Sequence, residues 1–272
     1  MLPPLLLVGG GAMGAAMLAG WREAGISSVV VADPSSAAQV LAGSGVAVVG
    51  SVAAVPDGFD PACVILAVKP QKADAVLPGL QRFGGVTLSI MAGRTIAGLG
   101  AGPTVRAMPN TPAAIRQGMT VACAGPRVDA AQHDLCDRLL RATGEVAWVE
   151  DENLLDAVTA VSGGGPAYVF LLAELLEQAA IAQGIPAPLA RQMARVTVAG
   201  SGALLAARVE DAAVLRQQVT SPAGTTERAL AVLMAADAWP ALVPRAIAAA
   251  TERSRALALV HTNAPGAGGS SS

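Results

Sequence analysis

A glycine-rich turn near the amino terminus restricts the possible folds of this chain more than any other feature. Gly9, Gly11 and Gly14 follow the apolar run Leu5–Val8 and precede an alanine-rich stretch. The pattern Gly-x-Gly-x-x-Gly between a strand and a helix is typical of a dinucleotide-binding βαβ unit. The first glycine permits a tight turn, the second lets the backbone approach a pyrophosphate, and the third allows close packing of helix on strand. A glycine turn with only a packing role is the alternative.

Short β-branched runs alternate with alanine-rich stretches up to about residue 150. Such near-continuous apolar runs are expected for a parallel sheet covered on both faces. The predicted strands are 5–8, 29–33, 46–49, 63–68, 86–91, 119–124 and 146–149. Beyond residue 150 the strand signals stop, and helices are predicted over 166–183, 186–209 and 239–260.

The resulting prediction is an α/β Rossmann-type N-terminal domain over residues 1–150 and an all-α C-terminal domain over 151–262. The helices of the second domain are apolar over wide arcs, which predicts that they carry subunit contacts and form a dimerisation domain. The Gly/Ser-rich tail, 263–272, is predicted to be disordered.

Composition excludes several classes of protein. Apolar residues make up 53% and charged residues 14%, so the chain is not intrinsically disordered. A net charge of −2 leaves no basic surface for nucleic acid. The three cysteines have no C-x-x-C spacing, which argues against a metal site and for buried thiols in a reducing compartment. The uncharged stretch from Leu2 to Trp21 is broken by prolines and glycines, so a cytoplasmic protein without a membrane segment is expected.

Other motifs offer polar groups to a ligand. Lys69-Pro70 follows the fourth predicted strand, and Asn110 lies between two prolines in a segment that cannot be helical. Asn110 has a donor and an acceptor suited to a nicotinamide carboxamide or to the substrate. The loops 162–166 and 220–226 combine hydroxyls and glycines at helix starts, where anions bind. The alternatives are a solvated lysine, a structural turn and ordinary helix capping.

The residues that are missing exclude familiar mechanisms. The only tyrosine, Tyr168, has a leucine four residues later, so there is no Tyr-x-x-x-Lys pair. His133 lies in a polar segment and His261 next to the tail, so both are expected at the surface, and no lysine follows Lys72. Oxidation of an alcohol requires a general base that this chain lacks. An imine, whose protonated form is already electrophilic, would need only orientation and a hydrogen-bond donor.

Taken together, these motifs resemble those of the pyrroline-5-carboxylate reductase family. The resemblance covers about residues 5 to 260 and is carried, in order, by 9–14, 67–70, 108–112, 162–168 and 221–226. It implies the last step of proline biosynthesis, in which a hydride passes from NADPH or NADH to carbon 5 of 1-pyrroline-5-carboxylate. It also implies a homodimer interlocked through the helical domain, often assembled into a decamer.

The resemblance also implies which residues face each ligand. The cofactor would be bound by Val8, Gly9, Gly10, Gly11, Ala12, Met13, Ala67, Val68, Lys69, Pro70, Met91 and Ala92. The motifs described above add Gly14, Asp33 and Asn110 to this set. The substrate would be held by Ser221, Gly224, Thr225 and Thr226, with the Thr226 hydroxyl as the catalytic donor to the ring nitrogen.

Two positions complicate this assignment. The family usually has two glycines where this chain has Ala223-Gly224. Asp33, 19 residues beyond Gly14, is placed to bind an adenosine ribose and to repel a 2′-phosphate, whereas Ser35 and Ser36 could accept one, so the sequence leaves the choice between NADPH and NADH open. Two other functions compete with this one: a related reductase that uses another cyclic imine or a deazaflavin, and a non-catalytic dinucleotide-sensing module.

Overall fold

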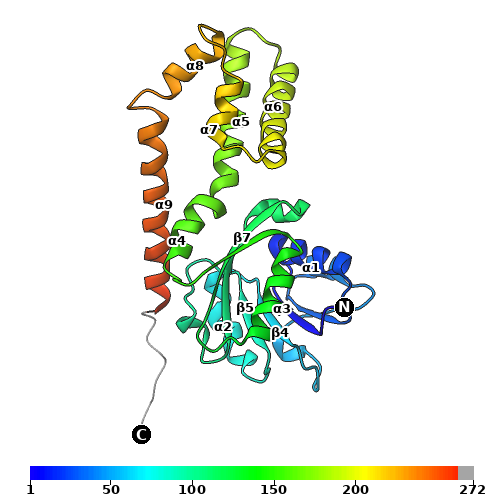
Figure 1. Ribbon diagram of the computed structural model, residues 1–272. Helices are drawn as coiled ribbons and strands as arrows, with labels where there is room; N and C mark the ends of the chain where they lie inside the picture. The colour runs from blue at the N-terminus through cyan, green and yellow to red at the C-terminus, as the bar shows by residue number, and fades with distance from the viewer. Residues whose placement is uncertain (263–272) are drawn as a thin grey trace. The chain divides into compact units, whose positions relative to one another are not determined.

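The computed structural model describes residues 1–262 and divides them into two compact units (Figure 1). The first unit comprises Met1–Gly163 and the described residues from Ala250 onward, and the second comprises Gly164–Ala249. The expected boundary at residue 150 precedes this division, because the segment just after 150 packs with the first unit. The predicted tail, 263–272, lies outside the described residues.

The first unit is built on an eight-stranded sheet with the order β3-β2-β1-β4-β5-β6-β7-β8. All neighbouring strands pair in parallel except β6 and β7, which are antiparallel. The strands are β1 (Leu5–Val8), β2 (Val29–Ala32), β3 (Val46–Val49), β4 (Cys63–Leu66), β5 (Val86–Ser89), β6 (Thr104–Met108), β7 (Gly118–Ala124) and β8 (Gly144–Val149).

The Rossmann-type fold class is confirmed, with two corrections to the sheet. The strand β6 was not predicted, because its five residues contain a charged Arg106 and lie between Pro103 and Pro109. The expectation of a wholly parallel sheet was wrong at the β6–β7 pair, since β7 follows β6 through a short 3₁₀ turn, η5 (Thr111–Ile115), with no crossover helix. Three predicted strands also end earlier than expected, at Ala32, Leu66 and Ser89.

Alternate residues of each central strand pack on opposite faces of the sheet. On one face, α1 (Ala12–Ala24) and α3 (Ala130–Arg141) cover a core that includes Leu5 and Leu7. On the other, α2 (Ala73–Leu80) covers Leu6 and Val8. Near β7, Leu155 of α4 (Leu154–Val158) packs on Val121 and Cys123. This two-sided burial explains why the strands read as continuous apolar runs.

The second unit is entirely helical. It contains α5 (Gly165–Ala182), α6 (Ala187–Ala207), α7 (Ala212–Gln218), α8 (Thr225–Leu233) and the first part of α9 (Trp239–Thr262). Figure 1 shows α5 and α6 running side by side. No residue of α5 is buried, and large apolar side chains such as Phe170, Leu175 and Val196 are exposed on α5 and α6.

The later part of α9 packs with the first unit. Ser254 Oγ donates a buried hydrogen bond of 2.6 Å to Asp156 Oδ1 in α4. A Cβ at Gly93, whose φ is +66°, would lie only 3.2 Å from Leu257 Cβ. Neither contact is visible as a local sequence pattern, because 98 residues separate Asp156 from Ser254.

Candidate functional site

The glycine-rich loop lies where the strand order of the sheet reverses. Chain order runs outward from β1 to β2 and β3 in one direction and to β4, β5 and β6 in the other. In open α/β sheets, ligands bind outside the carboxyl ends of the strands at this switch point. The segments that follow β1, β2, β4, β5 and β6 therefore share one edge, called here the carboxyl edge, and every predicted cofactor residue lies on or beside it.

Two of the four glycines in the first loop, Gly9 and Gly14, are required by contacts with backbone atoms, and Gly10 lies against a side chain. Gly9 has a φ of +106°, and a Cβ there would lie 2.6 Å from the Ala67 carbonyl oxygen. A Cβ at Gly10 would lie 2.9 Å from Leu41 Cδ1, and one at Gly14 would lie 2.2 Å from the Gly9 oxygen. At Gly11, by contrast, φ is −67° and a Cβ would meet nothing within 4 Å.

The open face at Gly11 fits a pyrophosphate. Helix α1 begins at Ala12 with no side-chain cap, and its first backbone bond within the helix runs from Ala15 N–H to the Gly11 oxygen. The N–H groups of Ala12, Met13 and Gly14 therefore have no intrahelical acceptor. Free amides and the positive end of the helix dipole are the groups that bind a phosphate.

Both carboxylate oxygens of Asp33 accept backbone hydrogen bonds. Gly10 N–H donates to Oδ2 at 2.7 Å, and Ser35 N–H donates to Oδ1 at 2.8 Å. Asp33 directly follows β2 and is only partly exposed. Its bond to Gly10 N–H holds the glycine loop in place. The carboxylate is therefore a held negative charge beside the loop, and Ser35 and Ser36 are both exposed next to it.

The loops after β4 and β5 are joined by a buried arginine that the sequence did not single out. Arg94 is 3% exposed; it donates two hydrogen bonds of 2.7 and 2.8 Å to the Asp74 carboxylate and one of 3.1 Å to the Pro70 carbonyl. Lys69 next to Pro70 is exposed, and the backbone of Ala67 and Val68 touches Gly9. The Met91 side chain is buried in the core, so only the backbone of that turn and Ala92 are presented to the edge.

Asn110 has its carboxamide engaged within the first unit. Met119 N–H donates to Oδ1 at 2.9 Å, and Nδ2 donates to Ser162 Oγ at 3.3 Å. Ser162 lies in a π-helical turn, η6 (Thr159–Gly163), which directly follows α4. Two of the motifs noted in the sequence, 52 residues apart, are thus brought together at the carboxyl edge.

The loop 220–226 lies in the second unit and ends at the start of α8. Gly224 is the residue before the helix, and no side chain caps it. The hydroxyl of Thr220 donates to the Arg216 carbonyl at 2.7 Å, whereas Ser221, Thr225 and Thr226 are exposed. Helix capping, the alternative considered for these residues, is therefore not what their side chains do in this structure.

Ala223 adopts a conformation that favours glycine. Its φ is +58°, in the left-handed region, and its N–H donates to Glu227 Oε2 at 2.8 Å. Gly224 has a φ of −84° and does not need to be glycine on that ground. The position where this chain departs from the family's motif is therefore the one at which the backbone is strained.

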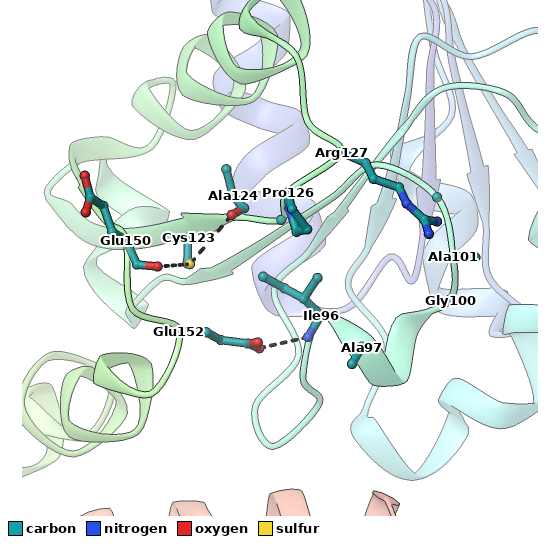
Figure 2. Close-up of a pocket in the computed structure, with 12 residues that line it drawn as sticks. Ile96, Ala97, Gly100, Ala101, Cys123, Ala124, Pro126, Arg127, Glu150 and Glu152 are labelled. Carbon is teal, nitrogen blue, oxygen red and sulfur yellow. Dashed lines mark hydrogen bonds between the residues drawn. The ribbon is translucent and has the colours of Figure 1, made fainter.

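A separate cavity of about 430 Å³ lies away from the glycine loop (Figure 2). Its lining includes residues 123–127, at and just beyond the end of β7. Because Gly125 N–H donates to the Thr104 carbonyl at the start of β6, the cavity lies at the edge of the sheet opposite the carboxyl edge. Figure 2 shows Glu152 accepting the Ile96 N–H, a bond of 2.8 Å. Glu152 also pairs with the buried Arg106 at 2.9 Å.

The cysteines are buried thiols, as the sequence predicted. Cys63, Cys123 and Cys136 are all free and buried. Burial, followed by the nearby Glu152 carboxylate, raises the pKa of the Cys123 thiol, and burial together with Cys136 raises the pKa of Cys63. Both thiols are therefore poor nucleophiles. Among the side chains that the structure describes, no group of three or more His, Cys, Asp or Glu could hold a metal ion.

Two family models match the chain. Residues 152–257 match the model described as pyrroline-5-carboxylate reductase dimerisation, and residues 5–93 match the one described as NADP oxidoreductase, coenzyme F420-dependent. The second match covers only the dinucleotide-binding part of the first unit.

Individual relatives cover nearly the whole chain. The pyrroline-5-carboxylate reductase of Pseudomonas aeruginosa is 37% identical over 268 residues, which cover 94% of this chain and 97% of that protein. The structure of the Coxiella burnetii enzyme of the same name has a TM-score of 0.86 and 31% identity, over 94% of this chain and 99% of that one. The Plasmodium falciparum pyrroline carboxylate reductase with NADP bound has a TM-score of 0.79 and 26% identity, over 94% and 98% of the two chains.

Proposed function

The chain belongs to the pyrroline-5-carboxylate reductase family, and from that membership we propose how its own residues divide the work of the reaction. It reduces 1-pyrroline-5-carboxylate to L-proline, which completes proline biosynthesis. When bound, NADPH or NADH supplies a hydride to carbon 5 of the pyrroline ring. The observation that carries the assignment of the cofactor site is the open face of Gly11 in a loop whose other glycines are all in contact.

We propose that the carboxyl edge of the first unit holds the cofactor. The free amides of Ala12, Met13 and Gly14 would bind the pyrophosphate, and Asp33 would bind the adenosine ribose. The loop Ala67–Pro70 and the turn at Ala92 would lie along the rest of the cofactor. Arg94 holds these two segments together through its hydrogen bond to the Pro70 carbonyl. The negative charge of Asp33 favours NADH over NADPH.

We propose that the loop Ser221–Thr226 of the second unit holds the substrate. The exposed hydroxyls of Ser221 and Thr225, with the free amides at the start of α8, would bind the carboxylate. The Thr226 hydroxyl would donate to the ring nitrogen, which gains electron density as carbon 5 is reduced. That bond therefore strengthens in the transition state. If the substrate binds protonated, its nitrogen has no lone pair, and the Thr226 hydroxyl donates to it only as hydride transfer creates one. If it binds unprotonated, the proton comes from water, because a neutral threonine is not an acid.

One substitution tests the role of Thr226. Thr226→Val keeps the shape of the side chain and removes only the donor, so kcat/KM for pyrroline-5-carboxylate should fall about 5- to 150-fold, equivalent to ~1–3 kcal/mol. Thr220→Val is the matched control, because that hydroxyl already donates to the Arg216 carbonyl of α7. The measurement is oxidation of NADPH, and separately of NADH, by the purified protein. Near-normal kcat/KM in Thr226→Val would overturn the role.

We propose that the protein is a cytoplasmic homodimer that binds neither membrane nor nucleic acid. By length and composition, Leu154–Ala182 could cross a membrane, and 11% of its most apolar window is buried in the single chain. The match to a dimerisation domain over residues 152–257 favours a second copy as the cover for this surface. Light scattering in detergent-free buffer distinguishes a dimer from a decamer, and recovery of the protein only with membranes would contradict the proposal.

A further inference from the structure

The contact between Asn110 and Ser162 has a defined direction. The backbone N–H of Met119 can only donate, so the Asn110 atom that it meets at 2.9 Å must be the carbonyl oxygen. The NH₂ group of Asn110 therefore points at Ser162 Oγ, 3.3 Å away. The amide of Asn110 is held in one orientation by the β7 backbone and cannot turn over without losing that bond.

The direction of this bond leaves the serine proton pointing elsewhere. Ser162 Oγ accepts from Asn110, so its own O–H is directed away from the amide. Among the residues and side chains that the structure describes, no acceptor for that O–H is found, and Ser162 is only partly buried. The hydroxyl is thus an oriented donor beside the carboxyl edge, within a π-helical turn, a local distortion that is frequent at functional sites.

The position of Ser162 along the edge indicates which end of the cofactor it meets. Asp33 follows β2, on one side of the glycine loop, and marks the adenosine end. Asn110 follows β6, on the other side of the loop, beyond β4 and β5. A Cβ built on Gly163 would lie 3.8 Å from Met108 Sδ, at the end of β6. The π-helical turn therefore lies against the end of that strand. A dinucleotide that starts at Asp33 and crosses the glycine loop has its nicotinamide on the β6 side.

We propose that Ser162 is a cofactor-binding residue that donates its O–H to the carboxamide oxygen of the nicotinamide, and that Asn110 is a positioning residue that aims it. Asn110 was expected to bind the carboxamide or the substrate directly, but its oxygen and one N–H are already committed within the protein. This inference rests on the proposed cofactor site. A fixed carboxamide sets the rotation of the nicotinamide ring and therefore which face is presented for hydride transfer.

The first test separates the nicotinamide from the rest of the cofactor. In Ser162→Ala, the Kd for NADH should rise about 5- to 30-fold, as for the loss of one hydrogen bond. The Kd for ADP-ribose, which lacks the nicotinamide, should stay within about twofold of the wild-type value. Thr159→Val is the matched control, because its hydroxyl lies in the same turn but donates to the Leu155 carbonyl at 2.7 Å. Both Kd values of the control should be unchanged.

The second test reverses the direction of the Asn110 bond. In Asn110→Asp, one carboxylate oxygen still accepts from Met119 N–H, while the other accepts the Ser162 proton and turns it away from the ligand. NADH binding should weaken as in Ser162→Ala, and the double variant should be no weaker than either single one. A residue with only a structural role would weaken ADP-ribose binding as well and would add to the effect of Ser162→Ala.

Three outcomes overturn the inference. They are unchanged NADH binding in Ser162→Ala, an equal loss for NADH and ADP-ribose, and a rise confined to the KM for pyrroline-5-carboxylate, which would assign the hydroxyl to the substrate. Failure of the underlying cofactor site would look different, because the wild-type protein itself would then bind neither NADH nor ADP-ribose.

Discussion

At the scale of single residues, Gly11 differs from its neighbours because a side chain there would contact nothing else in the protein. Its φ of −67° suits any residue, and the space beside it is empty. Gly11→Val should therefore leave the unfolding midpoint near the wild-type value and abolish measurable NADH and NADPH binding, because the branched side chain fills the space of the pyrophosphate. Gly102→Val, at another unobstructed glycine, is the control for calorimetric binding. A folded Gly11→Val protein with normal affinity would rule out this pocket.

Asp33 has two roles, which one substitution can separate. Asp33→Ser removes the charge that disfavours a 2′-phosphate, so the ratio of kcat/KM for NADPH to that for NADH should rise about tenfold or more. It also removes the acceptor for Gly10 N–H, so affinity for both cofactors should fall. Steady-state kinetics with each cofactor measure both effects. An unchanged ratio would mean that Asp33 serves only the loop.

Ala223 adopts a left-handed backbone conformation that its side chain disfavours. Ala223→Gly relieves a φ of +58° and should raise the free energy of unfolding by about 0.5–1 kcal/mol, after allowance for the greater freedom of glycine in the unfolded chain. Ala203→Gly, inside α6, should do the opposite and cost about 1 kcal/mol. Urea titrations compare the two variants. A less stable Ala223→Gly protein would show that the alanine is not strained.

At the scale of elements, the sequence predicted helices and strands correctly where the signal lies within a short run of neighbouring residues. The strand β3 was predicted with its observed bounds, as was β1, because both are short apolar runs between turn signals. The strand β6 was missed because it contains the charged Arg106. The partner that allows this charge to be buried, Glu152, lies 46 residues away in the chain. The same reasoning applies to the site. The glycine turn is readable, whereas the Arg94–Asp74 clamp and the Asn110–Ser162 bond depend on chain segments that only the fold brings together.

The hydrogen bond from Ser254 in α9 to Asp156 in α4 should contribute more to the free energy of unfolding than most single hydroxyl groups do. Ser254→Ala leaves the buried Asp156 carboxylate without that donor, so the free energy of unfolding should fall by about 1.5–3 kcal/mol. Ser27→Ala removes a bond to the neutral Leu2 carbonyl and should cost about 0.5–1.5 kcal/mol. Urea unfolding followed by circular dichroism compares them. Equal small losses would mean that Asp156 finds another partner.

At the scale of the whole molecule, the exposed apolar side chains of α5 and α6 are the surface that we propose to form the subunit contacts. Phe170 is 67% exposed in the single chain, and a charge there should disfavour burial against a second copy. Phe170→Glu should convert the dimer to a monomer at micromolar concentration, measured by light scattering. Ile115→Glu is the matched control, because Ile115 is 68% exposed but lies outside residues 152–257. A monomeric wild-type protein would contradict the proposal directly.

The return of α9 to the first unit has a consequence for how the protein is made. A nascent chain that has emerged from the ribosome as far as Gly163 already contains all eight strands. It still lacks Ser254 and Leu257, so Asp156 has no hydroxyl partner and the surface at Gly93 is uncovered. The packing of the first unit is therefore complete only after the segment that contains Ser254 and Leu257 has also been translated. Truncation before Ser254 should therefore lower the stability of the first unit, although most of that unit lies far from Ser254 in the sequence.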